Sequence, residues 1–277
     1  MEANKIKGES KSLVLDNGAE ITYCELGTQN EEVLVSGAFF FHTFMPVMKI
    51  LAQRYHVYGI VMRFDGPADI FDTDGGVHWT RQWGKDVYDF VVKMGIKKFH
   101  YFGKCHGTVP GWYLFKNHPE MLIDFCSFFL CPHLKGQDSD SWFEMARQGD
   151  IPKMMASAIR KPETGLPKKM AEAASIGNAA TGPAIPKYAA HPEKIWDSLD
   201  ECERDLRNAT VPIGYMFGSD DPLMNDYYTS NMYIWRVTKG CHFTILNGEK
   251  HLMEIDTPER VADEALAFID QAKKNYD

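Results

Sequence analysis

Cys105 stands at the centre of the five-residue segment Gly103-Lys104-Cys105-His106-Gly107. The segment lies between a predicted strand at 98–102 and a predicted helix at 107–117. Glycine two residues before and two residues after a nucleophile permits a tight turn, which projects the middle side chain from the edge of the sheet. A helix N-terminus and a neighbouring histidine both favour a thiolate. The segment therefore predicts a reactive thiol at Cys105; the alternative is a packed thiol in a glycine-rich turn.

An acid and a histidine follow this turn in the chain, each after a predicted strand. The strand at 211–217 leads into Gly218-Ser219-Asp220-Asp221, and the strand at 241–246 leads into a loop that contains His251. A nucleophile, an acid and a histidine in this chain order can form a catalytic triad, with the histidine as general base. His106 is a rival base because it is adjacent to Cys105.

Strands and helices alternate along most of the chain, which indicates βαβ units and a mostly parallel sheet. The alternation stops near Pro132 and resumes at Val211, and the Ala-, Met- and Lys-rich residues between are expected to be helical. We therefore expect an α/β fold whose central sheet is flanked by helices, with a core of residues 1–133 and 210–277 and a helical insertion at 134–209. The main elements are expected as a hairpin around 16–18, strands at 32–37, 56–62, 98–102, 122–131, 211–217 and 241–246, and helices at 44–54, 80–94, 107–117, 225–236 and 257–273.

Composition narrows the class of protein. The chain has 277 residues, 44% of them hydrophobic, and a formal net charge of −8, which argues against a nucleic-acid partner. We expect no membrane association, because no apolar stretch has the length of a membrane helix. The six cysteines form no C-x-x-C pair or metal-binding spacing, and the N-terminus has no apolar secretory stretch. These features predict a reduced, cytoplasmic protein with a small-molecule substrate and neither a metal nor a cofactor. The oligomeric state is left open, and a homodimer is compatible with the sequence.

The turn at Cys105, the turn ending at Asp221, and the His251 loop with its following helix together resemble the α/β-hydrolase fold family over about residues 12–274. His118-Pro119-Glu120 after the elbow helix is also similar to a common segment of that family. The resemblance implies that Cys105 is the nucleophile, His251 the general base and Asp221 the residue that orients His251. Asp220 is the alternative acid, with a role as a cap or turn residue if Asp221 is correct.

The resemblance also implies an oxyanion hole formed by two backbone N–H groups. The residue after the nucleophile, His106, is expected to provide one of them. The loop after the strand at 32–37 provides the other, from Ala38 or, failing that, from Phe39. The family commonly has His-Gly in this loop, whereas this chain has Ser36-Gly37. The chain also departs from the family pattern at 62–67, a loop that shapes pockets.

By the same resemblance, the insertion is a lid over the site. Aromatic and Met side chains near the site suit a partly apolar substrate, although they could equally form the lid's own core. The candidate pocket residues are Phe39, Phe40, His42, His133, Trp142, Phe143, Met145 and Met154.

The leading hypothesis is a hydrolase that cleaves an ester, thioester or lactone through an acyl-cysteine intermediate. A Cys nucleophile on this fold is similar to the dienelactone hydrolases. The main alternative is an acyltransferase, because the Gly-x-Cys-x-Gly segment also resembles the polyhydroxyalkanoate synthases. A ligand-binding protein without catalysis is a third hypothesis, and carbon–carbon bond cleavage on this fold also remains open.

Overall fold

The computed structural model describes residues 10–38, 41–63, 77–133, 135, 141–158 and 195–276. Eight strands in these ranges form one sheet in the order β1-β2-β4-β3-β5-β6-β7-β8. β1 and β2 pair antiparallel, β2 pairs antiparallel with β4, and the remaining neighbours are parallel. The strands are β1 (Ser10–Val14), β2 (Glu20–Leu26), β3 (Val33–Ala38), β4 (His56–Val61), β5 (Phe99–Lys104), β6 (Leu122–Phe128), β7 (Ile213–Gly218) and β8 (His242–Leu246).

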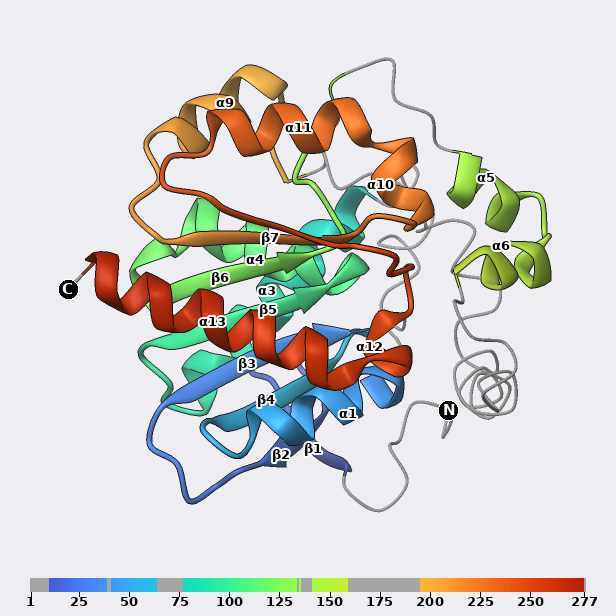
Figure 1. Ribbon diagram of the computed structural model, residues 1–277. Coiled ribbons are helices and arrows are strands. Elements are labelled where there is room, and N and C mark those ends of the chain that lie inside the picture. The colour runs from blue at the N-terminus through green and yellow to red at the C-terminus, as the bar shows by residue number, and fades with distance from the viewer. Residues whose placement is uncertain are drawn as a thin grey trace.

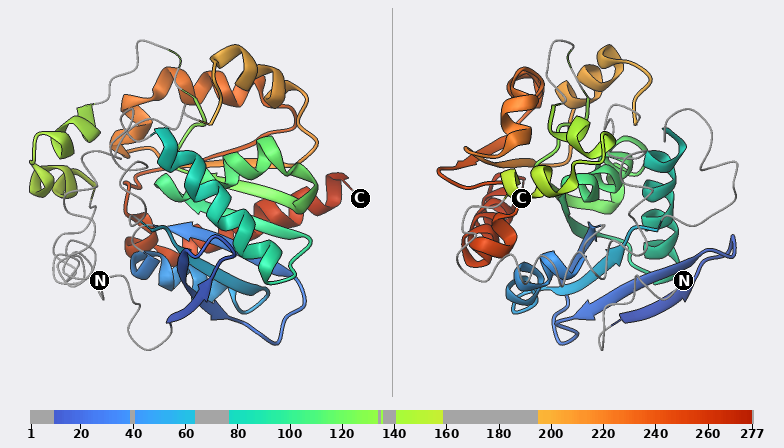
Figure 2. Two further views of the ribbon diagram at one scale, coloured as in Figure 1. Left: turned by 180° about the vertical axis from the view of Figure 1, so that it is seen from behind. Right: turned by 90° about the vertical axis from the view of Figure 1, so that its right-hand side faces the viewer.

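Helices cover both faces of the sheet (Figures 1 and 2). α1 and α13 pack against each other on one face, and α3 and α4 pack against each other on the opposite face. The α-helices are α1 (Phe41–Leu51), α3 (Val77–Lys93), α4 (Thr108–Asn117), α5 (Ser141–Arg147), α6 (Ile151–Ala158), α9 (Leu199–Arg207), α10 (Pro222–Asp226), α11 (Tyr228–Val237), α12 (Met253–Asp256) and α13 (Pro258–Tyr276). Short 3-10 turns lie at η2 (Cys105–Gly107) and η3 (Pro119–Met121).

The central strands are buried on both faces, as expected of parallel strands between two helical layers. Every residue of β5 and of β7 is buried. The α/β architecture with a mostly parallel sheet, predicted from the sequence, is therefore confirmed. The carboxyl ends of β5, β7 and β8 lead directly into the segments that carry the three predicted triad residues.

The ends of most elements are slightly shifted from the predicted bounds, and two of the differences have a clear structural basis. The strand expected at 122–131 ends at Phe128, because Phe129 adopts a left-handed backbone conformation with φ 76°. An apolar run gives no sign of such a turn. The helix expected at 225–236 is two helices, α10 and α11, which are separated at Tyr227. The predicted insertion at 134–209 lies largely outside the described residues, and its role as a lid stays a prediction.

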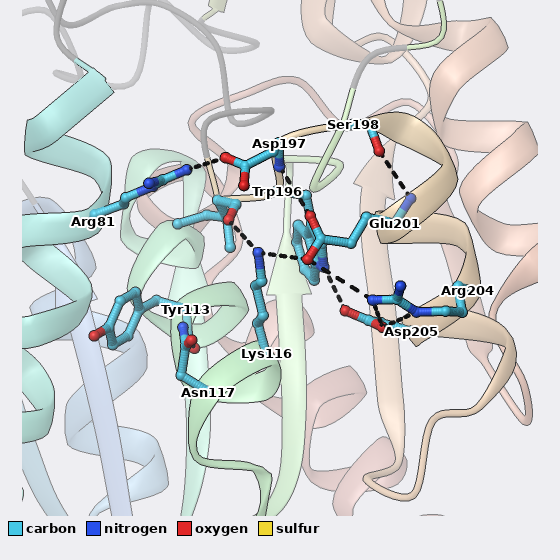
Figure 3. A network of polar contacts seen from close by, with 11 residues as sticks. Arg81, Tyr113, Lys116, Asn117, Trp196, Asp197, Ser198, Glu201, Arg204 and Asp205 are labelled. Carbon is cyan, nitrogen blue, oxygen red and sulfur yellow. Dashed lines mark hydrogen bonds and ion pairs between the residues drawn. The ribbon is translucent and has the colours of Figure 1, made fainter.

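A polar network attaches the last part of the predicted insertion, at residues 195–205, to helices of the core (Figure 3). The Lys116 ammonium on α4 donates to the Ile195 carbonyl at 3.1 Å and lies 3.1 Å from a Glu201 carboxylate oxygen. Arg81 on α3 pairs with Asp197 at 2.6 Å. This segment is therefore attached to α3 and to α4, the helix that begins directly after the Cys105 turn.

Among the helices in the described part of the chain, none combines the length and the apolar character that crossing a membrane requires.

Candidate active site

Cys105 occupies a strained turn between β5 and α4. Its φ of 50° lies in the left-handed region, which L side chains rarely adopt and which is found at functional sites. The flanking glycines are required by close packing. A Cβ on Gly107 would lie 1.8 Å from the Gly37 carbonyl oxygen, and one on Gly103 would lie 2.4 Å from the Gly107 carbonyl oxygen. Gly107 is therefore required by the contact of this turn with β3, and Gly103 by the close approach of the two ends of the turn.

Asp221 and His251 form a buried pair beside this turn. Asp221 Oδ2 lies 3.0 Å from His251 Nδ1, and its Oδ1 accepts a hydrogen bond of 2.8 Å from the Leu223 amide at the start of α10. Both carboxylate oxygens are therefore fixed. Asp220 is exposed and accepts a hydrogen bond from Ser219 instead. Of the two acids that the sequence offered, only Asp221 lies against His251.

Two imidazoles act on the Cys105 thiol. His106 Nδ1 lies 3.4 Å from Cys105 Sγ, and His251 is the second imidazole that lowers the pKa of the thiol. Burial raises the pKa of Cys105, but the charges and hydrogen bonds of His106 and His251 outweigh it, so that the pKa lies well below the ordinary thiol value. Burial likewise lowers the pKa of His251, but Asp221 and the Cys105 thiolate raise it to about 9. Both shifts favour a thiolate beside an imidazolium.

Two aromatic side chains contact the His251 ring. The Phe129 and Trp142 rings each have their centroid 4.7 Å from that of His251. Phe129 is fully buried and has the left-handed backbone described above. Phe129 was not predicted as a site residue, because it lies within an apolar run that was expected to continue as a strand. The one available signal was its place at the carboxyl edge of the sheet, where the triad residues also lie.

Trp142 belongs to a helical pair that is attached to the site at both ends. The Asp226 carboxylate accepts from the Ser141 hydroxyl and the Trp142 amide, each at 2.7 Å, and so caps α5. At the end of α6, the Ala158 carbonyl accepts a hydrogen bond of 3.1 Å from Leu252, the residue after His251. The described part of the predicted insertion therefore contacts the histidine loop directly.

A second unpredicted contact links the nucleophile segment to the histidine segment. The Lys104 ammonium, next to Cys105, forms an ion pair with Glu254, three residues after His251. Both side chains are buried, Glu254 completely. No spacing in the sequence relates two residues so far apart, so the pair could not be predicted.

The predicted oxyanion donors stay predictions. Ala38 is the last residue of β3 and is buried, and Gly37 beside it packs against the Cys105 turn at Gly107. His106 follows Cys105 in that turn. The alternative donor, Phe39, lies outside the described residues.

The predicted pocket residues divide into three groups. Trp142 contacts His251, as described. Met154 is buried, and its backbone carbonyl accepts a hydrogen bond of 3.2 Å from the Trp142 indole. His133 and Met145 are half-buried. Outside the described residues lie Phe39 and Phe40, together with the side chains of His42 and Phe143.

The five other cysteines are unlike Cys105. Cys24, Cys126, Cys131 and Cys202 are buried, and Cys241 is half-buried. Burial raises the pKa of Cys126, Cys202 and Cys241. Within the described ranges, no group of three His, Cys, Asp or Glu side chains is placed to hold a metal ion.

Comparisons with known proteins place this geometry in a known fold. No protein-family model matches the sequence. No curated protein sequence gives a significant match either. Solved structures do match across nearly the whole chain. A serine hydrolase from Cycloclasticus zankles superposes with a TM-score of 0.75 at 13% identity, covering 95% of this chain and 98% of its own. The chain has the α/β-hydrolase fold.

Two further neighbours of this fold are similar over the same extent. An enol-lactonase from Burkholderia xenovorans has a TM-score of 0.70 at 14% identity, covering 94% of this chain and 99% of its own. An esterase from a Rhodococcus species has a TM-score of 0.66 at 17% identity, covering 95% of this chain and 98% of its own. In the α/β-hydrolase fold, the turn after β5 is the place of the nucleophile elbow, and in this chain that turn holds Cys105.

Proposed function

We propose that this protein is a hydrolase that cleaves an ester, thioester or lactone of a partly apolar small molecule through an acyl-cysteine intermediate. Cys105 is the nucleophile, His251 the general acid and base, and Asp221 the residue that orients His251. The observation that carries the proposal is the convergence of three groups at one edge of the sheet. They are a thiol on a left-handed turn, the His251 imidazole that lowers the pKa of this thiol, and a buried carboxylate 3.0 Å from Nδ1 of that imidazole.

In the first half of the reaction, the Cys105 thiolate attacks the carbonyl carbon and a sulfur–carbon bond forms. The carbonyl π electrons move to oxygen, where the backbone N–H groups of Ala38 and His106 stabilise the negative charge. As the tetrahedral intermediate collapses, the bond to the leaving group breaks. The His251 imidazolium gives its proton to the leaving alcohol or thiol.

In the second half, neutral His251 accepts a proton from water, and the hydroxide attacks the acyl-cysteine. The sulfur–carbon bond then breaks and its electron pair returns to sulfur, which restores the thiolate beside the imidazolium. Asp221 stabilises that imidazolium and keeps its ring in place throughout. The contacts of Phe129 and Trp142 with the ring restrict it further.

Acyl trapping tests this proposal. The full-length protein is mixed with p-nitrophenyl acetate, S-phenyl thioacetate or dihydrocoumarin, quenched in acid, and measured by intact-protein and peptide mass spectrometry. We expect an acyl adduct on Cys105 with at least one of these probes, and hydrolysis that stops after treatment with iodoacetamide. Cys105→Ala is expected to lose both adduct and turnover, whereas the matched variant Cys126→Ala keeps both.

Full hydrolysis by Cys105→Ala would overturn the assignment of the nucleophile. Acyl transfer that outruns hydrolysis when an alcohol or thiol acceptor is added would replace the hydrolase with an acyltransferase. Tight ligand binding in calorimetry without turnover on any probe would replace it with a ligand-binding protein.

A further inference from the structure

The Cys105 sulfur has a second imidazole beside it that the proposed triad does not use. His106 is 8% exposed, and its Nδ1 lies 3.4 Å from Cys105 Sγ. The ring meets Trp83 edge to face, with centroids 6.4 Å apart. Trp83 is itself buried, and its indole donates to the Arg63 carbonyl at 2.9 Å. The packing therefore directs the His106 ring toward the sulfur rather than toward solvent.

We propose that the His106 side chain is a further catalytic residue, which donates a hydrogen bond from Nδ1 to the Cys105 sulfur and stabilises the thiolate when it leaves the acyl-enzyme. This inference rests on the proposed function and adds a role to it. The backbone N–H of His106 keeps its expected place in the oxyanion hole.

The need for a second donor follows from what His251 does in the same step. During deacylation, His251 takes a proton from water, so the nitrogen of its ring that faces the reacting groups is engaged with the water and does not also stabilise the departing sulfur. The sulfur–carbon bond breaks and the electron pair moves to sulfur, where negative charge accumulates. An N–H group already directed at that sulfur stabilises the charge as it forms. His106 gains and loses no proton, so the proton balance of the reaction is unchanged.

Other ionisable groups around this turn are engaged elsewhere. From β5, the Tyr101 hydroxyl donates to the Gly107 carbonyl at 2.7 Å, and Lys104 is paired with Glu254. β3 and the first turn of α4 contain no ionisable side chain. From the histidine loop, His251 faces the thiol with Asp221 behind it. His106 and His251 are therefore the two groups in the described residues that are placed to stabilise this thiolate, and both lower the pKa of Cys105.

Alkylation of Cys105 tests the inference without any substrate. The rate of reaction with iodoacetamide is measured from acidic to alkaline pH on the full-length protein, with peptide mass spectrometry to follow Cys105 alone. In His106→Phe, which keeps an aromatic ring without a donor, we expect the midpoint of the thiolate titration to rise by about one pH unit or more. At alkaline pH the alkylation rates should converge, because Cys105 is then a thiolate in every variant. His106→Gln, which retains an N–H donor, should recover part of the shift.

His118→Gln is the matched control. His118 also stacks on an aromatic ring, that of Tyr88, but it is not among the groups that lower the pKa of Cys105. The pH profile of Cys105 alkylation in His118→Gln should therefore follow that of the wild type. A His106→Phe profile that coincides with the wild type would overturn the inference. If His106→Phe does not fold, His106→Ala takes its place with the same two outcomes.

A kinetic measurement separates this role from a structural one. With p-nitrophenyl acetate, His106→Phe should keep the burst of p-nitrophenol but lower the steady-state rate about 10-fold or more, the size expected for a hydrogen bond to a charged group. Because acyl-enzyme then accumulates, kcat and KM should fall together. An equal loss of burst and steady state would contradict the inference. A Cys105→Ala enzyme that stays active would instead overturn the proposed function, whatever the alkylation profiles show.

Discussion

Two buried aspartate–histidine pairs lie at opposite ends of the same sheet. At the carboxyl end, His251 Nδ1 lies 3.0 Å from Asp221 Oδ2. Near the other end, His100 Nδ1 lies 2.7 Å from Asp124 Oδ2, from neighbouring positions of β5 and β6. In both pairs the carboxylate fixes the imidazole through the same nitrogen. The pairs share their local chemistry, so the pair alone does not make a catalytic site.

The two pairs differ in the second group that lies near each imidazole. His251 meets the Cys105 thiol, on a turn that opens at the sheet edge. His100 Nε2 lies 3.1 Å from a Glu32 carboxylate oxygen, and Glu32 is held in turn by Lys273 at 2.7 Å. One histidine has a nucleophile as its second neighbour, and the other has a second acid. The first arrangement can move a proton during a reaction, whereas the second holds one in place as part of the core.

The largest expected effect comes from removing each imidazole in turn. His251→Gln should lower kcat for p-nitrophenyl acetate by at least about 10³-fold with little change in stability. His100→Gln should leave kcat within a few-fold but lower the free energy of unfolding by about 3 kcal/mol, because it leaves a buried carboxylate unpaired. Steady-state kinetics and urea denaturation of both variants measure the two effects. A large loss of kcat in a folded His100→Gln protein would remove the distinction between the pairs.

Removing each carboxylate should have a smaller effect and a different pH signature. His251 must carry a proton to supply it to the leaving group, so the wild-type acylation rate should fall as the pH rises through about 9. Asp221→Asn removes the carboxylate that raises this pKa, so the alkaline limb should move to lower pH and kcat should fall about 10²-fold or more. Asp124→Asn is the matched control and should leave the limb in place. Presteady-state acylation rates measured across the pH range test this prediction. An alkaline limb that stays at the wild-type pH in Asp221→Asn would contradict the role assigned to Asp221.

The smallest expected effect is on how stability depends on pH. Burial lowers the pKa of His100, but Asp124 and Glu32 outweigh it, so the folded-state pKa lies above the ordinary value of 6.5. Its contribution to stability is therefore complete below about pH 6.5 and is lost as the pH rises through the folded pKa. The difference in unfolding free energy between wild type and His100→Gln should fall across this window by at most about 1.4 kcal/mol per pH unit. A difference that stays constant with pH would show that His100 is not protonated in the folded protein.

Much of the fold and of the candidate site was predictable because the signals are local. The alternation of apolar runs with amphipathic segments predicted the order of strands and helices that the structure has. Gly103 and Gly107 marked the turn at Cys105, and the structure shows why a larger side chain would not fit there. The positions of Asp221 and His251 after successive strands placed them at one edge of the sheet, because parallel strands end together.

Other features depend on contacts between distant segments, which leave no periodic trace in the sequence. The left-handed backbone of Phe129 lies in a run that is apolar throughout. The pairing of Lys104 with Glu254 joins elements far apart in the chain, and the contact of Trp142 with His251 depends on how Asp226 caps α5. The pairing of His100 with Asp124 is a further case, because nothing near His100 in the sequence indicates which acid it contacts.

The sequence by itself determined the class of fold, the chain order of nucleophile, acid and histidine, and the turn that presents Cys105. These properties follow from hydrophobic periodicity and from glycine at positions of close approach, which depend on residues near one another in the chain. Only the tertiary structure decided that Asp221 rather than Asp220 lies against His251 and that aromatic rings contact that imidazole. It also decided that a second imidazole, that of His106, points at the sulfur. The physical reason is that side-chain direction and burial are set by packing between elements, and the packing forms only when the whole sheet and its helices come together.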